Sequence, residues 1–353
     1  MGITCALVVR WHSSKTANKL LIFFGVFVLA SCSKPVTFAE RPSAFSDDVF
    51  YQKNGGNKMD ILVINDNSIS MVKEQAEMGG KIQNLLDTLT LLDWRIAMTT
   101  TDVSNRALGL KGDLLATDST NLRIIDRQTP RANAQFLELV SRPESIECYF
   151  PEYERPPSLC PSDYERPITA VSMAIAKAKS QNSDFFRDDA DLALLFLTDE
   201  DEDFRESPEV DGKGTTAETL LNEFNQLWGR AKSLYAYGII VKPEDSDCLE
   251  SQQSGGFVSS FGSEVNKLID LTGGLSGSIC SEDYGQILSE VGDHMVDRGT
   301  SFMLRHRPVE HSFSLTLDPP QDIPWGVSGQ VLYFAAPPAR GTEIRTNYRY
   351  WTE

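Results

Sequence analysis

The sequence predicts an α/β fold: a mostly parallel central sheet flanked by helices, followed by a small antiparallel β unit. Short, continuously apolar segments alternate with amphipathic segments of helical period between residues 57 and 298. That order is typical of parallel strands with helices on both faces of the sheet. From residue 299 onwards apolar and polar residues mostly alternate with period two, and proline pairs interrupt them. This second pattern indicates antiparallel strands.

Residues 1–31 are predicted to be a signal peptide. Three basic residues precede the apolar run 20–30 (LLIFFGVFVLA), which is too short to span a bilayer and has the flanks of a signal-peptide core. The run ends in Leu29-Ala30-Ser31-Cys32, which resembles a bacterial lipobox, where the Cys becomes the lipidated N-terminus after cleavage. Ser33, rather than Asp, follows Cys32, and this resembles the sorting signal of lipoproteins that are sent to the outer membrane. The alternative is an ordinary secretory signal with a chance cysteine.

The charge of the remaining chain excludes some partners. The leader holds three of the 33 Lys and Arg residues and none of the 50 Asp and Glu residues, which leaves a formal net charge of −20. A body this acidic repels nucleic-acid phosphates and anionic lipids. We therefore expect no nucleic acid and contact with the membrane only through the anchor. Most of the acidity is accounted for by solubility alone.

The four cysteines that follow the anchor predict two disulfide bonds, because an even set in an exported protein is typical of a disulfide framework. We favour Cys148–Cys160 and Cys248–Cys280, since each pair is local and lies in a loop-rich stretch. Closing the first of these loops contributes roughly 3 kcal/mol at best. Zinc is the alternative, but no paired C-x-x-C spacing or nearby His supports it.

The elements are expected in the following order. Residues 32–56 form a lipidated tether with a lead-in strand at Val49-Phe50-Tyr51, and residues 142–164, with five prolines and two cysteines, form an inserted loop. Buried strands are predicted at 59–64, 94–101, 192–197 and 235–241, with a further strand at 122–125. Helices are predicted at 72–92, 134–140, 168–178, 216–232, 262–271 and 284–296. Gly79-Gly80 should weaken or bend the first helix.

The C-terminal unit, residues 299–353, is expected to contain about four strands. Phe313, Leu315 and Leu317 alternate with polar residues, the segment 331–336 (VLYFAA) is more apolar, and the segment 343–350 alternates again. We expect this unit to pack on the main domain and to pair with the lead-in strand near Phe50.

A metal site is predicted at the carboxyl edge of the parallel sheet. Asp66, Ser68 and Ser70 stand at alternate positions after the first buried strand, and their hard oxygens suit Mg²⁺ or Mn²⁺ rather than zinc or copper. Alone, this D-x-S-x-S motif is weak, because Asp and Ser at such a turn commonly cap a helix. Thr169 opens a later helix and Asp199 follows the strand 192–197. Parallel strands deliver these loops to one edge.

This set resembles the metal-ion-dependent adhesion site of von Willebrand factor A domains. The surrounding text (MDILVINDNSISM, then TTTD, then LLFLTDEDED) is similar to A-domain lipoproteins of predatory and gliding bacteria over Asn57 to Arg298. The resemblance implies a Rossmann-like domain. It also implies the ligand roles: Ser68, Ser70 and Thr169 as direct ligands, and Asp66 and Asp199 as ligands that act partly through water. An open coordination position would accept a carboxylate from a partner.

The chain departs from the family's pattern in two places. Asn65 stands where relatives usually carry an apolar strand residue, and Glu165-Arg166-Pro167 replaces the small glycines that often precede the Thr ligand. The acidic run Glu200 to Asp203 lacks the spacing and the Gly of an EF-hand, which favours a solvated acidic loop over a second cation site.

The sequence favours a binding protein over an enzyme. None of the four histidines lies beside the metal motif, and neither a G-x-S-x-G elbow nor a phosphate-binding glycine loop is present. A magnesium-dependent hydrolase with Asp66 as nucleophile would need a lysine and a further acidic pair that the pattern does not supply. A fixed part of an envelope complex, with a merely stabilising metal, is the other alternative. We expect an envelope-anchored protein whose partner, a protein or surface ligand, presents an acidic side chain to the cation.

Overall fold

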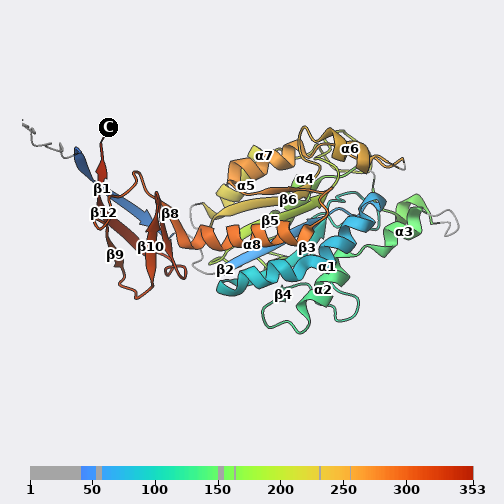
Figure 1. Cartoon of the computed structure of the whole chain (residues 1–353). Coiled ribbons are helices and arrows are strands. Elements are labelled where there is room, and N and C mark those ends of the chain that lie inside the picture. The colour runs from blue at the N-terminus through green and yellow to red at the C-terminus, as the bar shows by residue number, and fades with distance from the viewer. Residues whose placement is uncertain are drawn as a thin grey trace, which may run out of the picture. The chain divides into compact units, whose positions relative to one another are not determined.

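A computed structural model of the chain describes residues 41–52, 58–149, 155–162, 164–229, 232–254 and 256–352 (Figure 1). The predicted signal peptide and Cys32 lie outside the described residues. Among those that are described, no helix has both the length and the apolar character needed to cross a bilayer.

The strands and helices that the sequence predicts for the main domain appear in the expected order, together with additional short elements at 143–149, 246–252 and 276–278. The strands are β1 (Ser43–Tyr51), β2 (Lys58–Asn65), β3 (Asp93–Thr100), β4 (Ile125–Asp126), β5 (Asp191–Thr198), β6 (Leu234–Ile240), β7 (Ser276–Ser278), β8 (Ser301–Met303), β9 (Ser314–Asp318), β10 (Trp325–Ser328), β11 (Val331–Phe334) and β12 (Glu343–Trp351). The α-helices are α1 (Val72–Thr88), α2 (Ala132–Val140), α3 (Pro143–Tyr149), α4 (Pro167–Ala176), α5 (Ala217–Trp228), α6 (Ser246–Gln252), α7 (Ser263–Thr272) and α8 (Tyr284–Thr300).

The central sheet has six strands in the order β4-β3-β2-β5-β6-β7. Strands β3, β2, β5, β6 and β7 run parallel, and only β4 is antiparallel to its neighbour. The three middle strands β2, β5 and β6 are buried along almost their whole length, as expected of apolar runs covered on both faces. The predicted fold class, a mostly parallel sheet flanked by helices, is therefore confirmed.

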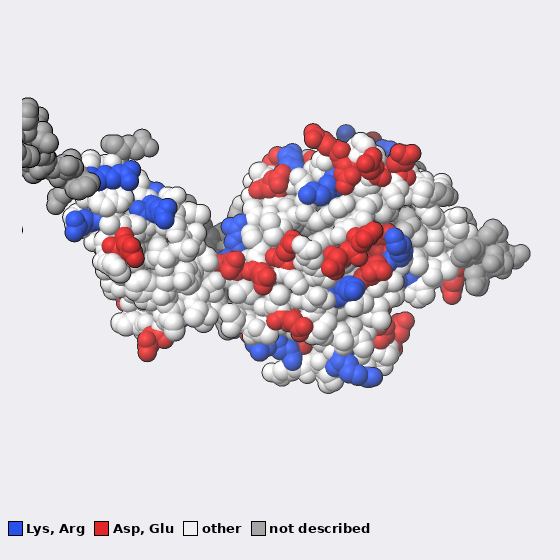
Figure 2. Space-filling model, viewed as in Figure 1, with Lys and Arg blue, Asp and Glu red and all other residues white. Residues whose placement is uncertain are grey.

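Helices cover both faces of this sheet. On one face, Ile61 and Val63 of β2 pack in a core with Leu85 of α1 and Leu288 of α8, and Figure 1 shows α1 and α8 side by side across it. On the other face, Leu62 and Ile64 join the core formed by α4, α5 and α7. Figure 2 shows acidic side chains spread over the surface of this domain, in keeping with its excess of Asp and Glu.

Gly79-Gly80, which the sequence analysis expects to weaken or bend this helix, does not interrupt α1. A Cβ on Gly79 would lie 2.4 Å from Leu137 Cδ1 of α2, and a Cβ on Gly292 would lie 1.7 Å from Thr88 Oγ1. The glycines therefore allow α2 and α8 to approach α1 closely, and this packing compensates for their low helix propensity.

The antiparallel strands form two three-stranded sheets, β1-β12-β9 and β10-β11-β8. Strand β1 is longer than the expected lead-in strand and pairs with β12 along its whole length, with Phe50 opposite Ile344. The predicted pairing near Phe50 is confirmed. The buried hydroxyl of Tyr348 donates to Asp48 Oδ2 at 2.6 Å, so a polar contact also joins the two strands.

The inserted segment 142–164 contains more regular structure than a loop. Pro143 begins α3, where a proline at the first helical position costs no hydrogen bond. The structure contains disulfide bonds between Cys148 and Cys160 and between Cys248 and Cys280, the pairing expected from the sequence.

Candidate metal centre

The central sheet brings the two predicted aspartates to one edge. Asn65 ends β2 and Thr198 ends β5, two adjacent parallel strands whose register pairs Asn65 with Leu197. The chain continues this pairing for one more residue, because the Asp66 amide donates to the Leu197 carbonyl at 2.9 Å. Asp66 and Asp199 therefore leave the carboxyl edge of the sheet beside each other, where ligands bind in open α/β sheets.

Four of the five predicted ligands lie in one hydrogen-bonded cluster. The hydroxyl oxygens of Ser68 and Ser70 are 2.8 Å apart, and the Ser70 hydroxyl donates to Asp199 Oδ1 at 3.2 Å. The Ser68 amide donates to Asp66 Oδ1 at 2.8 Å, which folds the turn back towards the strand. The Thr198 hydroxyl donates to Asp66 Oδ2 at 2.8 Å. Both aspartates are fully buried.

Thr169, the fifth predicted ligand, is engaged elsewhere. Its hydroxyl donates to Glu202 Oε1 and accepts the Thr215 amide at 2.9 Å. Glu202 Oε2 in turn accepts the amides of Ile168 at 2.7 Å and Thr169 at 3.2 Å, so this carboxylate caps the start of α4. The structure therefore gives Thr169 a different set of partners from Asp66, Ser68, Ser70 and Asp199.

The acidic run that follows Asp199 is not simply a solvated loop. Glu202 is 5% exposed, and burial raises its pKa to about 7 although hydrogen bonds from Thr169 and Thr215 oppose that rise. Asp201 accepts the amides of Glu264 at 2.9 Å and Val265 at 3.2 Å, which caps α7. Both side chains thus position helices that cover the sheet.

Glu165 is a residue of this site that the sequence analysis did not select. It stands just before α4, is 1% exposed, and accepts a hydrogen bond from the Thr101 hydroxyl at Oε2. Its Oε1 is buried and has no partner among the described residues. In the sequence, Glu165 stands out only because it occupies a position where the family in question usually has glycine.

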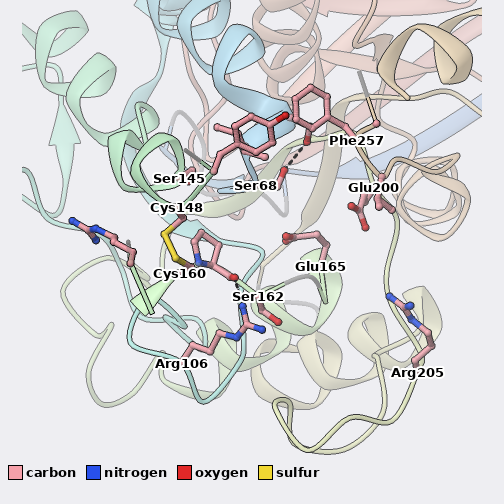
Figure 3. A pocket seen from close by; sticks show the side chains of 17 residues that line it. Ser68, Arg106, Ser145, Cys148, Cys160, Ser162, Glu165, Glu200, Arg205 and Phe257 are labelled. Carbon is pink, nitrogen blue, oxygen red and sulfur yellow. Dashed lines mark hydrogen bonds between the residues drawn. A yellow bond between two sulfur atoms is a disulfide. The ribbon is translucent and has the colours of Figure 1, made fainter. Parts of the chain in front are cut away.

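A cavity of about 550 Å³ opens onto the cluster. Figure 3 shows Ser68, Glu165 and Glu200 around this cavity, with the Cys148–Cys160 disulfide on its wall. The rings of Tyr149 and Phe257, whose centroids are 5.7 Å apart, also line it. A group from outside can therefore reach the serine hydroxyls, beside an apolar and aromatic wall.

Within the described part of the chain the buried acidic groups of the cluster form no ion pair, although Arg106, Arg155 and Arg205 line the same cavity. No ion pair within the described ranges involves Asp66, Glu165 or Asp199. Burial, together with the charges of the nearby Asp66 and Glu200, raises the pKa of Asp199 to about 9. Burial likewise raises the pKa of Asp66 and, more strongly, that of Glu165, to which the charge of Asp66 adds. Such raised values follow from desolvation and like-charge repulsion.

The residues fit a hard divalent cation. The side chains of the four clustered residues offer carboxylate and hydroxyl oxygens as metal ligands, and Asp199 Oδ2 is buried with no partner in the described parts of the chain. No group of three or more His, Cys, Asp or Glu side chains in those parts is arranged to hold a metal ion, so any site here depends on the serine hydroxyls as well. A cation at this point would satisfy Asp199 Oδ2 and offset the buried negative charge.

The unusual Asn65 has a structural partner. Its side-chain amide donates to the carbonyl of Val140, the last residue of α2, at 2.8 Å. It therefore ties the end of β2 to the helix beside the inserted segment instead of facing an apolar core.

Comparisons with known proteins add the following. No family model matches the sequence, and no curated protein matches it. The pilus adhesin SpaC of Lactobacillus rhamnosus GG is similar at 9% identity and a TM-score of 0.33, over 89% of this chain and 41% of that one. Proximal thread matrix protein 1 of the mussel byssus is similar at 12% identity and a TM-score of 0.34, over 70% of this chain and 50% of that one. The manganese-loaded TRAP protein of Plasmodium vivax is similar at 10% identity and a TM-score of 0.30, over 78% of this chain and 91% of that one. This chain thus spans half or less of the first two proteins, and at these TM-scores we draw its function from its own site.

Proposed function

We propose that this chain is an envelope-anchored protein, and not an enzyme, that binds a protein or surface ligand through a divalent cation, Mg²⁺ or Mn²⁺. The observation that carries the proposal is the fully buried Asp199 Oδ2, which has no partner among the described residues and belongs to the carboxylate that accepts from Ser70 in the Ser68–Ser70 hydroxyl pair. A buried carboxylate oxygen without a partner is costly unless a ligand satisfies it. The cavity, which is lined by Ser68 and Ser70, provides access to these hydroxyls from outside.

The hydrogen bonds suggest a different role in cation binding for the serines and for the aspartates. Ser68 and Ser70 would offer their hydroxyl oxygens, and Asp66 and Asp199 would supply the negative charge. Thr198 holds one oxygen of Asp66 at 2.8 Å and the Ser68 amide holds the other, so Asp66 is pre-oriented. A bound cation would supply an electropositive contact for an acidic side chain that enters the cavity from a partner.

The test is calorimetric titration of the purified protein with Mn²⁺ and Mg²⁺, followed by thermal unfolding with and without the metal. Asp66→Asn should abolish Mn²⁺ binding and the rise in Tm that binding causes, because it removes a charged ligand from a buried site. Asp211→Asn, which only affects an exposed pair with Lys111, is the matched control and should bind as the parent does. Mn²⁺ binding by Asp66→Asn at the parent's affinity would refute the assignment.

Two other functions make different predictions in the same experiment. A metal that only stabilises an envelope complex predicts partner binding that persists after the cation is removed with a chelator. A hydrolase predicts Mg²⁺-dependent turnover of phosphate esters that Asp66→Asn abolishes. The proposed binding function predicts that partner binding is lost on chelation and that turnover is absent.

The anchor is part of the proposal. Cys32, in Leu29-Ala30-Ser31-Cys32, would carry the lipid that holds the protein at the outer membrane, on its periplasmic or its outer surface. Cys32→Ala should move the protein from the detergent phase to the aqueous phase in phase partitioning. A variant that stays in the detergent phase would contradict the lipobox interpretation.

A further inference from the structure

We propose that Glu165, rather than Thr169, supplies the cation ligand from the loop that precedes α4. This inference rests on the proposed function and deepens it, because it changes the composition of the site. Glu165 lines the same cavity as Ser68 and Ser70. Thr169 does not line that cavity, and its hydroxyl is committed to Glu202 and Thr215.

The position of Glu165 is fixed by the loop around it. The Arg166 amide, next to Glu165, donates to the Thr101 carbonyl at 3.1 Å, and the Asp203 amide donates to the Glu165 carbonyl at 2.9 Å. The Thr101 amide donates to the Asn65 carbonyl at 3.2 Å. The loop is therefore bonded to the residue that follows β3, which is itself bonded to the end of β2, one residue before Asp66. These hydrogen bonds place Glu165 at the edge of the sheet where Asp66 lies.

The Glu165 side chain then has one oxygen occupied and one free. Thr101 donates to Oε2, while Oε1 is buried without a partner among the described residues. With Asp199 Oδ2, this makes two unpartnered carboxylate oxygens, from two different loops, at the same edge of the sheet. A cation beside the Ser68 and Ser70 hydroxyls would be offered both oxygens, because these serines line the cavity together with Glu165 and Ser70 donates to Asp199.

A third carboxylate changes the charge of the site. Asp66, Asp199 and Glu165 together carry three negative charges when ionised, so these three ligands and a dication have a net charge of −1. A site with more charged ligands holds its cation more tightly. It also presents a weaker field to an incoming carboxylate, so a partner's acidic group would compete with Glu165 for the cation.

The experiment compares Mn²⁺ affinity, by calorimetry on the purified protein, for four variants. Glu165→Gln should lower the affinity by about tenfold or more, and Glu165→Asp should retain part of it. Thr169→Val should bind within about twofold of the parent, since its hydroxyl is not a ligand. Asp66→Asn reports on the proposed function itself.

Thermal unfolding without metal separates a ligand from a structural residue. If Glu165 is a ligand, Glu165→Gln should melt at or above the parent's Tm in the absence of metal, because the amide oxygen can still accept from Thr101 without a buried carboxyl group beside Asp66. Its Tm should rise less than the parent's when Mn²⁺ is added. A fall in Tm with unchanged Mn²⁺ affinity would overturn the inference. So would a loss of affinity in Thr169→Val, folded by its melting curve, with Glu165→Gln unaffected. If the parent binds no Mn²⁺, the proposed function fails; if only Asp66→Asn loses binding, the inference alone fails.

Discussion

The ammonium of Lys232 lies 3.3 Å from the carboxylate of Asp60, and both side chains are completely buried. Asp60 also forms an ion pair with the guanidinium of Arg187 at 2.7 Å, so one buried carboxylate pairs with two cationic side chains. These groups lie at the start of β2, at the end of the sheet opposite the candidate metal centre.

Asp60→Asn should lower the free energy of unfolding by about 3–5 kcal/mol, because it removes the counter-charge of the fully buried Lys232 and leaves Arg187, among the described residues, only its ion pair with Asp93. Urea denaturation measures the change. Asp189→Asn breaks an ion pair with Lys58 whose members are about half and one third exposed, and it should cost less than about 1 kcal/mol. Equal losses in the two variants would contradict the difference between buried and exposed pairs.

Stability should respond to pH through Lys232. Burial lowers the pKa of Lys232 below its usual 10.5, although the charge of Asp60 opposes that shift. Between the two pKa values the unfolded chain binds more protons than the folded one, so a rise in pH favours the folded state. The free energy of unfolding of the parent should therefore rise relative to that of Lys232→Met as the pH approaches 10.5. A difference that is flat or falls over this interval would refute the depressed pKa.

Thr198 should act as a positioning residue for the metal centre. Its hydroxyl donates to Asp66 Oδ2 at 2.8 Å and accepts the Glu200 amide at 3.1 Å. Thr198→Val should therefore weaken Mn²⁺ binding by about tenfold to a hundredfold, as loss of a group that orients a ligand does. Calorimetric titration measures the affinity.

Thr99→Val is the matched control for that variant. The Thr99 hydroxyl is buried in β3 and has no partner among the described residues. Replacing it with a methyl group should leave Mn²⁺ affinity unchanged and raise the free energy of unfolding by about 1 kcal/mol. If Thr99→Val weakened Mn²⁺ binding as much as Thr198→Val, the effect of Thr198 would be general rather than local.

The Cys248–Cys280 bond joins residues separated by 32 positions. Replacing both cysteines by alanine should cost about 3–4 kcal/mol, the value that chain entropy predicts for a loop of this length. Urea denaturation of the double variant measures this, with the reduced parent as a second comparison. A loss below about 1 kcal/mol would mean that the unfolded chain is not constrained by this loop.

The parts of the fold that were predictable from the sequence are those with a strong local pattern. Strands β2, β5 and β6 are runs of apolar residues, and their burial on both faces explains why the pattern is continuous. Strand β7, Ser276–Ser278, has no such pattern, since it exists only through its pairing with Gly238–Ile240 of β6. Similarly, β8 and β10 are short, and their pairing with β11 determines them.

The candidate site likewise contains residues that the local sequence pattern predicts and residues whose positions depend on tertiary contacts. Asp66, Ser68 and Ser70 lie within one turn, so their spacing limits how far apart they can be. Thr169 has the right chemistry and the right order, but a tertiary contact with Glu202 determines where its hydroxyl points. Glu165 depends on contacts with Thr101 that are remote in the sequence. No local pattern reports such a contact.

The pairing of β1 with β12 has a consequence for how the protein is made. Ser43 lies opposite Trp351, so β1 can pair with β12 only after the chain has been synthesised as far as residue 351. Contacts this distant in sequence form slowly, because a long loop must close first. Until then β1, with Phe45 and Tyr51 exposed, is a strand with open edges, which is the kind of segment that associates with other chains. A chain that lost only its last strand would remain in that state permanently.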